Sequence, residues 1–366
     1  MTDAPRLRQP LSVPTFAAVA LAPLPMFGLG LWAGGPWLWP GFLYMFALTA
    51  VLDRLTPHVA ADAAEGQEFP GSDALLVTVA LSALLLLPLA TWAIAGPSAL
   101  PGSARALLFF GAALWLGQVG HPAAHELIHR PNRWLFRLGT ALYAAVLFGQ
   151  HASAHRLVHH RHVATRQDPN SAPRGMSFYR FAPRAWIGSF RAGHRAEADL
   201  RARNGGRRGP HPYLWHLAGS LAALGTAWAI VGGPGLLAWW GLAALTQAQI
   251  LLSDYVQHYG LQRQPLPDGR AEPVGPAHSW NSAPWFSSAL MLNAPRHSDH
   301  HSHPTRPYPA LRLDAAEEAP RLPWPLPLAC TIALVPPLWK RGIHPVLRQW
   351  QVADAPAKVL AKVTEG

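Results

Sequence analysis

Charged side chains are scarce in this chain of 366 residues. They make up 13% of the sequence, whereas roughly 25% is usual for a soluble globular protein, and half of all residues are hydrophobic. Residues 11–52, 74–104 and 217–253 contain no Asp, Glu, Lys or Arg. Because about 20 apolar residues suffice to cross a bilayer as a helix, each stretch is long enough for at least one span. The sequence therefore excludes an ordinary soluble domain and predicts an integral membrane protein.

Cysteine is nearly absent, since Cys330 is the only one in the sequence. A single cysteine excludes a disulfide within the chain and any Cys-rich iron or zinc module. Acidic side chains are also few: 19 Asp and Glu stand against 30 Lys and Arg, which gives a net charge of +11. Fifteen arginines lie between His121 and Tyr213, in a segment flanked by apolar stretches, and such charge marks the cytoplasmic side of a membrane protein. The positive charge therefore indicates membrane topology rather than nucleic-acid binding.

Turns rich in Gly and Pro divide the apolar stretches into separate helices. Residues 34–36 form one such turn and residues 232–235 form another. The expected spans are residues 11–32, 37–52, 74–95, 106–124, 213–231 and 236–253. The fold class is therefore all-α, with six transmembrane helices in a single domain over residues 1–366. With the N-terminus in the cytoplasm, the six helices form three hairpins that each return the chain to that side.

Helical structure should also extend beyond the spans. We expect the fourth span to continue into His125 and His129, and the sixth to continue into Asp254 and His258. Two further apolar segments, residues 134–149 and 322–339, are interrupted by Arg137 and by five prolines, respectively. They are expected to be interfacial or buried helices rather than spans.

Histidine, by contrast, is abundant, with 19 in the chain. Nine of them form four clusters between residues 125 and 301: His125 and His129; His155, His159 and His160; His258; and His297, His300 and His301. Spacings of three and four residues place imidazoles on one face of a helix. Neutral imidazole is the commonest protein ligand for transition metals. Nine such ligands are too many for one ion and suit two, and the expected topology places all four clusters on the cytoplasmic side.

Several kinds of metal chemistry remain compatible with the clusters. Residues 125–129 read His-Glu-Leu-Ile-His, a pattern typical of zinc metalloproteases, but that interpretation leaves three clusters without a role. A histidine-rich metal carrier is a second alternative, although carriers bind their cargo near the bilayer midplane and these clusters lie at helix ends and in loops. Two irons can bind O2 together and share the electrons needed to cleave it. Soluble di-iron bundles use carboxylates for this purpose, and here histidines replace them.

In order and kind, the four clusters resemble those of the membrane alkane 1-monooxygenase family. That family belongs to the integral-membrane fatty acid desaturase and hydroxylase group, which also includes xylene monooxygenase. Residues 125–130 (HELIHR) are similar to its first motif, and residues 155–160 have the spacing of its second. Residues 255–261 resemble the isolated histidine motif of the hydroxylases, and residues 278–282 with 296–308 resemble the last motif. The resemblance covers roughly residues 120–311.

The resemblance implies a desaturase/hydroxylase-like domain with a cytoplasmic histidine-rich di-iron cap, in the bacterial inner (plasma) membrane. It implies a non-haem di-iron monooxygenase that hydroxylates a C–H bond, in the first place the terminal methyl group of an n-alkane. The nine histidines would be the ligands of two iron ions, and rubredoxin or ferredoxin, with a separate reductase, would supply electrons for the reaction with O2. The alternatives are a fatty acyl desaturase or hydroxylase, a xylene-type aryl-methyl hydroxylase and a terpene hydroxylase.

Positions beside the histidines depart from the family pattern. Ala154 stands where the family usually has Glu, Val158 where it has Gly, and Gln257 where it has Glu. Such positions orient and tune metal ligands. The departures therefore bear on the substrate and on redox tuning more than on the reaction class.

Carboxylates near the clusters are candidates to hold the N–H groups of the ligating imidazoles. Those inside the motifs are Glu126, Asp254 and Asp299. For Asp168, a local cap or a pair with an arginine is equally expected. His121 and His151 extend the first two clusters by one turn, and they either support the ligands or make plain polar contacts.

Overall fold

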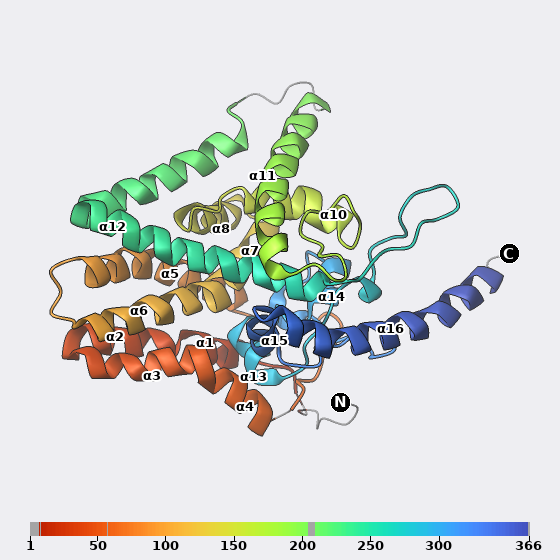
Figure 1. Ribbon diagram of the computed structural model, residues 1–366, viewed down its shortest axis with the longest axis horizontal. Helices are drawn as coiled ribbons and strands as arrows, with labels where there is room; N and C mark the ends of the chain where they lie inside the picture. The colour runs from red at the N-terminus through yellow and green to blue at the C-terminus, as the bar shows by residue number, and fades with distance from the viewer. Residues whose placement is uncertain (1–6, 8, 57, 204–208, 365–366) are drawn as a thin grey trace.

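The computed structural model is all-helical. It describes residues 7, 9–56, 58–203 and 209–364, with side chains described up to residue 351, and this part of the chain contains no strand. Figure 1 shows the long helices side by side in one part of the molecule, while the short helices α10 and α14 lie with several loops at one end of them. The all-α expectation is confirmed.

The first four expected spans are helical, although several are built from short pieces. The first contains α1 (Val13–Leu21) and α2 (Pro23–Ala33), and after the 3-10 turn η1 (Gly35–Trp37) the second contains α3 (Leu38–Leu43), the π-helical η2 (Tyr44–Leu48) and α4 (Thr49–Leu55). The third is α5 (Ser72–Ala95). The fourth runs without a break through α6 (Gly102–Trp115), the π-helical η3 (Leu116–Gly120) and α7 (His121–His129). It therefore continues into the first histidine cluster, as expected.

The fifth and sixth expected spans are two arms of α12 (Pro212–His258). Val231 and Gly232 leave the helical conformation between the arms, and Gly232 has φ 61° and ψ −141°, a region that is essentially open only to glycine. Figure 1 shows that the chain reverses at this point. Five helical runs are thus long and apolar enough to cross a membrane, where the sequence predicted six: Val13–Ala33, Gly35–Leu55, Ser72–Ala95, Gly102–His129 and Pro212–His258.

The remaining helical elements lie outside the expected spans. They are α8 (Arg133–Ala145), α9 (His151–Ala154), π-helical η4 (His155–His159), α10 (His160–His162), α11 (Phe178–Arg203), η5 (Pro276–His278), α13 (Trp285–Leu290), α14 (His297–Ser302), η6 (Tyr308–Ala310), α15 (Leu326–Ala333) and α16 (Pro336–Thr364). The expected helices at residues 134–149 and 322–339 correspond to α8 and to α15 with the start of α16.

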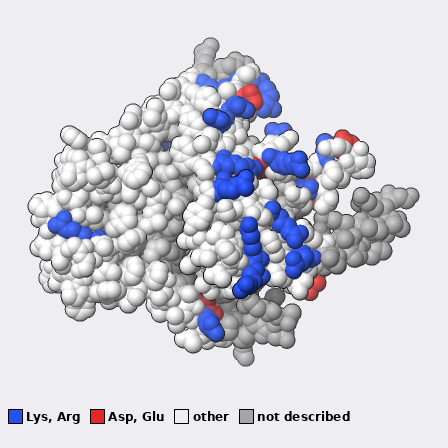
Figure 2. Space-filling view, viewed as in Figure 1, with Lys and Arg blue, Asp and Glu red and all other residues white. Residues whose placement is uncertain are grey.

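The outer surface of the long helices is apolar. Large side chains such as Trp32, Leu85 and Leu237 are 86%, 61% and 72% exposed, which is unfavourable in water and favourable against lipid. On the face that Figure 2 shows, Lys and Arg side chains gather over the half with α10 and α14, while the opposite half of that face is almost free of charge. This distribution supports an integral membrane protein.

Candidate metal centre

All nine clustered histidines meet at one end of the helix bundle. They form two groups, within each of which the available ring nitrogens lie within 4.8 Å of one another. The first group has five members and the second has four: His125, His129, His155, His160 and His300; then His159, His258, His297 and His301. The structure therefore brings together every histidine that the sequence singled out as a ligand, in two sets.

The positions of these side chains follow from local helix geometry. His125 and His129 are one turn apart on α7, and His297 and His301 are one turn apart on α14. His258 is the last residue of α12. The second cluster begins in the π-helix η4, and π-helical turns are frequent at functional sites because they redirect side chains.

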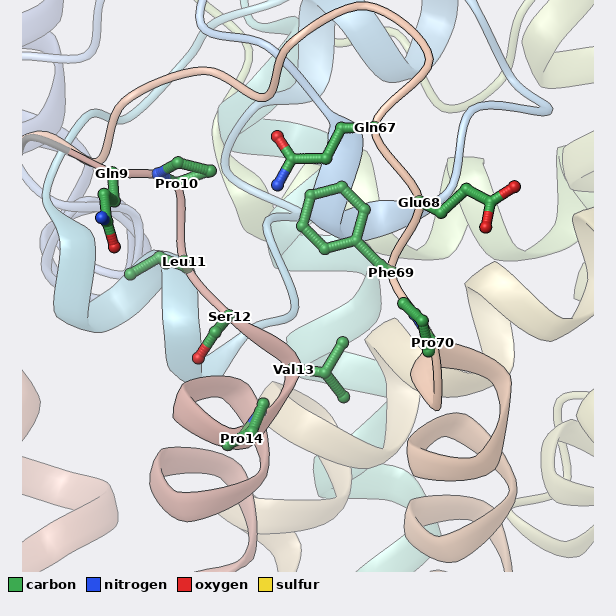
Figure 3. Close-up of a pocket in the computed structure, with 10 residues that line it drawn as sticks. All are labelled: Gln9, Pro10, Leu11, Ser12, Val13, Pro14, Gln67, Glu68, Phe69 and Pro70. Carbon is green, nitrogen blue, oxygen red and sulfur yellow. The ribbon is translucent and has the colours of Figure 1, made fainter.

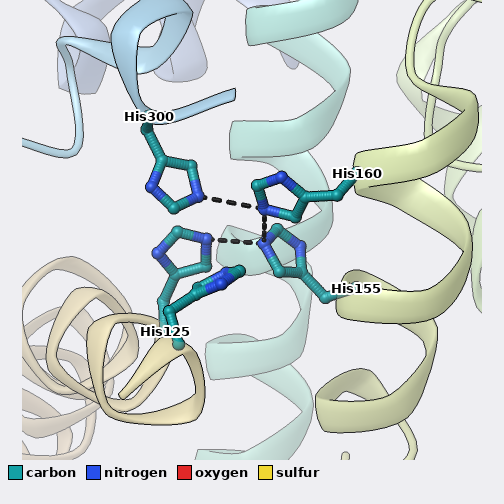
Figure 4. A group of neighbouring side chains, drawn as sticks. His125, His155, His160 and His300 are labelled. Carbon is teal, nitrogen blue, oxygen red and sulfur yellow. Dashed lines mark hydrogen bonds between the residues drawn. The ribbon is translucent and has the colours of Figure 1, made fainter. Parts of the chain in front are cut away.

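In the first group the Nε2 atoms converge. His155 Nε2 lies 2.7 Å from His125 Nε2 and 2.9 Å from His160 Nε2, and His160 Nε2 is 3.1 Å from His300 Nε2 (Figure 4). Two imidazole nitrogens that are each ~2.1 Å from one metal ion and at right angles to each other are about 3 Å apart. The buried Nε2 atom of His129 has no hydrogen-bond partner among the described residues. These distances fit a single transition-metal ion.

The second group shows the same pattern. His297 Nε2 lies 3.1 Å from His258 Nε2 and 3.1 Å from His301 Nε2. The Nε2 atom of His159 is buried and has no hydrogen-bond partner in the described part of the chain. The two groups are neighbours, since the rings of His160 and His301 are 4.5 Å apart. The arrangement therefore fits two adjacent ions.

The electrostatics keep most of these rings neutral. Burial lowers the pKa of five of them well below the usual value, and neighbouring imidazoles lower it further: His155, His160, His297, His300 and His301. A neutral ring keeps the lone pair that a metal ion needs. Because neither group contains a carboxylate, the donor set is imidazole alone, which suits iron, copper, zinc or nickel.

Asp168 supports the second group directly. Its Oδ2 atom lies 2.8 Å from His159 Nδ1, and both side chains are buried. Burial alone lowers the pKa of His159, but the adjacent Asp168 carboxylate outweighs it and raises that pKa. The same Oδ2 atom accepts a hydrogen bond from Ser171 at 2.7 Å. Of the two interpretations left open for Asp168, support of a histidine is the one that the contacts favour.

The other three carboxylates make different contacts. Glu126 Oε2 accepts a hydrogen bond from the Tyr308 backbone N–H at 3.1 Å and lies 3.4 Å from Arg130. Asp299 pairs with His303 at 2.8 Å and with Arg306. Asp254 accepts a hydrogen bond from the Asn170 side chain at 2.6 Å.

None of the hydrogen bonds described for Glu126, Asp254 or Asp299 reaches one of the nine histidines. Asp254 is connected to the centre indirectly, because the Asn170 backbone N–H donates to Asp168 Oδ1 at 3.0 Å. Asn170 was missed from the sequence. A signal existed, since Asp-Pro-Asn-Ser at residues 168–171 is typical of a turn closed by an Asp side chain.

Two of the three departures from the family pattern, Ala154 and Gln257, make specific local contacts. Gly193 of α11 packs so closely on α9 that a Cβ atom there would lie 3.0 Å from Ala154, so a small residue at position 154 accompanies the close approach of the two helices. Gln257 bridges two segments: its Oε1 accepts a hydrogen bond from Ser253 at 2.7 Å, and its Nε2 donates to the Ala294 carbonyl at 3.1 Å. Gln257 therefore ties the end of α12 to the loop before α14.

Two surface hollows lie apart from the histidines. One, of about 500 Å³, lies between residues 9–14 and the loop 67–70 (Figure 3). The other, of about 480 Å³, is lined mainly by apolar side chains of α11 and α12, including Phe178, Trp186 and Trp240. Neither is lined by a member of the two histidine groups.

Comparisons with known proteins agree with this centre. The family model described as fatty acid desaturase matches residues 97–330. Alkane 1-monooxygenase 1 of Pseudomonas aeruginosa is 35% identical over 65% of this chain and 63% of its own length, and alkane 1-monooxygenase 2 of the same organism is 30% identical over 87% and 86%. The hydroxylase component of the xylene/toluene monooxygenase of Pseudomonas putida is 31% identical over 64% of this chain and 63% of its own length. The chain therefore belongs to the fatty acid desaturase family and, within it, to the alkane 1-monooxygenase group.

Proposed function

We propose that this protein is a non-haem di-iron monooxygenase that hydroxylates a C–H bond of a hydrophobic substrate. The observation that carries the proposal is the pair of adjacent all-histidine groups, five and four in number, at one end of an apolar helix bundle. The names of the relatives favour the terminal methyl group of an n-alkane as the reacting site. The xylene/toluene relative makes an aryl-methyl substrate the second candidate.

Each histidine group would hold one iron ion. When bound, the two irons would supply O2 binding and the electrons that cleave it. The protein holds the ligands in place: the Asp168 carboxylate orients His159, and one-turn spacings on α7 and α14 aim pairs of imidazoles at the same point. Burial keeps most of the rings neutral and limits the access of bulk water.

The alternatives fit the contacts less well. A zinc protease would use Glu126 as a general base on a metal-bound water, whereas this carboxylate is engaged by Arg130 and by the Tyr308 backbone. A protease would also need three ligands rather than nine. An acyl desaturase or hydroxylase uses related chemistry, and product analysis separates it from an alkane hydroxylase.

We further propose that both arms of α12 cross the bilayer, so that six spans carry a cytoplasmic cap in the bacterial inner membrane. The concentration of Lys and Arg at the histidine end supports this orientation (Figure 2). Rubredoxin or ferredoxin, itself reduced by a separate reductase, would deliver electrons to the centre, since the single cysteine leaves no place for a Cys-ligated iron centre in this chain.

The test begins with the metals. Protein purified in detergent from iron-supplemented cells should contain about two irons per chain. With O2, rubredoxin, a reductase and the reduced nicotinamide that the reductase oxidises, it should convert n-octane to the primary alcohol. About one zinc and no iron would instead favour the protease, and an alkene product from a fatty acyl substrate would favour the desaturase.

A further inference from the structure

Three polar side chains outside the two histidine groups form a compact set, which we call the polar trio: His121, Tyr143 and His151. The Nδ1 atom of His121 is 2.9 Å from the Tyr143 hydroxyl. The ring of Tyr143 lies 4.8 Å from that of His151, and the rings of His121 and His151 are 5.8 Å apart. The three residues come from α7, α8 and α9, so the tertiary fold assembles the trio.

The polar trio lies directly against the first histidine group. His151 stacks on His155 at 5.1 Å, and His121 is 5.9 Å from His125. His121 precedes His125 by one turn, on the side of α7 that continues into the apolar helix α6. The trio therefore occupies the boundary between the proposed metal ions and the apolar bundle.

The loop that joins Tyr143 to His151 is anchored to the second arm of α12. The indole N–H of Trp239 donates to the Ala145 carbonyl at 2.8 Å, and the Gln247 amide donates to the Val146 carbonyl at 2.8 Å. These contacts hold the loop, and with it Tyr143 and His151, against the second arm of α12.

His151 has an unused hydrogen-bonding atom in this position. Its side chain is 2% exposed, Phe148 stacks on it at 5.2 Å, and its Nε2 has no partner among the described residues. A buried polar atom without a partner is costly, and a bound ligand or water commonly supplies the missing hydrogen bond. His121 is half-buried, so the trio combines one enclosed ring with one that is partly accessible.

We propose that the polar trio binds a hydroxyl group of the hydrophobic substrate, a few bonds from the C–H bond that is oxidised. This inference rests on the proposed hydroxylase function and narrows its substrate class. A plain alkane has no atom that can pair with His151 Nε2, whereas a hydroxyl group does. Because a hydroxyl both donates and accepts, it pairs with either tautomer of the ring. The preferred substrate is therefore a long-chain alcohol, and an unsubstituted alkane is oxidised less efficiently.

The test compares n-octane, octan-2-ol and octan-3-ol as substrates and as ligands. For the wild-type protein, kcat/KM for the better alcohol should exceed that for octane by roughly tenfold or more, the effect of one buried hydrogen bond. His151→Phe removes the nitrogen and keeps an aromatic ring against Phe148, so the preference should disappear. Tyr143→Phe, which removes a single oxygen atom, should reduce the preference by a smaller factor. The matched control is His194→Gln, an exposed histidine of α11, which should keep the wild-type ratio.

Two further measurements accompany turnover: iron content, and retention of each compound by the purified protein without reductant. A preference that survives His151→Phe with iron retained would overturn the inference, since a water molecule would then be the partner of His151. Loss of iron in that variant would also overturn it, because His151 would be a structural support of the centre. Failure of the proposed function would look different: the wild type would lack iron and oxidise none of the compounds. In that case the ratio of retained alcohol to retained octane would still test whether the polar trio binds a hydroxyl group.

Discussion

The carboxylate of Asp168 and the imidazole of His159 form a buried pair at 2.8 Å, with Asp168 Oδ2 against Nδ1 of the ring. This contact leaves Nε2 of His159 as the nitrogen that faces the second histidine group. Among the hydrogen bonds of the described residues, Asp168 is the carboxylate that bonds to a member of either histidine group. A single residue thus sets the tautomer and the direction of one expected ligand.

Replacing this carboxylate should weaken the second metal position. Asp168→Asn keeps the shape of the side chain but removes the charge that favours an Nδ1–H on His159. We expect affinity for the second iron to fall roughly tenfold to a hundredfold, as is typical when the hydrogen-bond partner of a ligand is lost. Iron content measured against chelator concentration checks this. Asp268→Asn, an exposed loop substitution, is the control, and equal iron retention in both variants would contradict the prediction.

The division into two groups predicts separable metal losses. His300→Ala removes a ligand of the five-membered group, and His301→Ala removes one from the four-membered group. Each should bring bound iron from about two per chain towards one, and abolish hydroxylation, because two irons are needed to share the electrons. Metal counting and Mössbauer spectra of the two variants should show different surviving sites.

The control for these variants is close by in the sequence. His303 is 54% exposed and pairs with Asp299 rather than with a member of either group. His303→Ala should therefore retain both irons. Full hydroxylation activity in His300→Ala would refute the assignment of the first group.

Much of the architecture could be predicted because its causes are local. The lack of charge over residues 11–52 identifies membrane helices without any knowledge of packing, and the one-turn spacing of His125 and His129 identifies ligands on one face. The turn between the last two expected spans is visible in the same way, and the structure adds that Val231 and Gly232 carry the non-helical backbone between the two arms of α12.

The supporting contacts could not be predicted because they are made across the fold. Glu126 lies inside the first motif, yet its hydrogen bond is to the backbone of Tyr308, 182 positions later. Asn170 connects Asp254 to the metal centre because its side chain donates a hydrogen bond to that carboxylate, 84 positions away. Proximity in sequence to a ligand is therefore a poor guide to which carboxylate holds it. The partition of nine histidines into five and four likewise depends on tertiary packing.

Glu126 offers a direct distinction between protease and oxygenase. Its carboxylate accepts from the Tyr308 backbone, and a carboxamide oxygen can still accept that hydrogen bond. Glu126→Gln should therefore keep about two irons per chain and at least partial hydroxylation, with a stability loss of about 1–3 kcal/mol from the weakened contact with Arg130. Loss of all activity with normal metal content and stability would instead assign a chemical role to this carboxylate.

The metal-free protein should lose stability in mild acid. Burial lowers the pKa of His155, His160, His297, His300 and His301 below the usual 6.5, so these rings stay neutral in the folded state while the unfolded chain takes up protons. Stability from these rings is complete above pH 6.5 and is lost as the pH falls below that value. The raised pKa of His159 has the opposite effect on stability, but it concerns one ring, whereas the lowered pKa values concern five.

Thermal unfolding of the chelator-treated protein in detergent checks this pH dependence. The unfolding temperature should fall between pH 6.5 and pH 5, and the iron-loaded protein should show a similar fall, since protons compete with the metal for the same nitrogens. A metal-free protein that is equally stable at both pH values would contradict the assignment of neutral buried rings.

The reversal within α12 depends on one glycine. Gly232 has φ 61° and ψ −141°, and a Cβ atom there would meet no other atom within 4 Å, so the cost of a side chain is purely conformational. Gly232→Ala should destabilise the protein by about 1–3 kcal/mol, measured as a lower unfolding temperature in detergent. Gly233→Ala is a matched control, because the neighbouring glycine has equal space and no positive φ. Equal unfolding temperatures of the two variants would contradict the requirement for glycine at position 232.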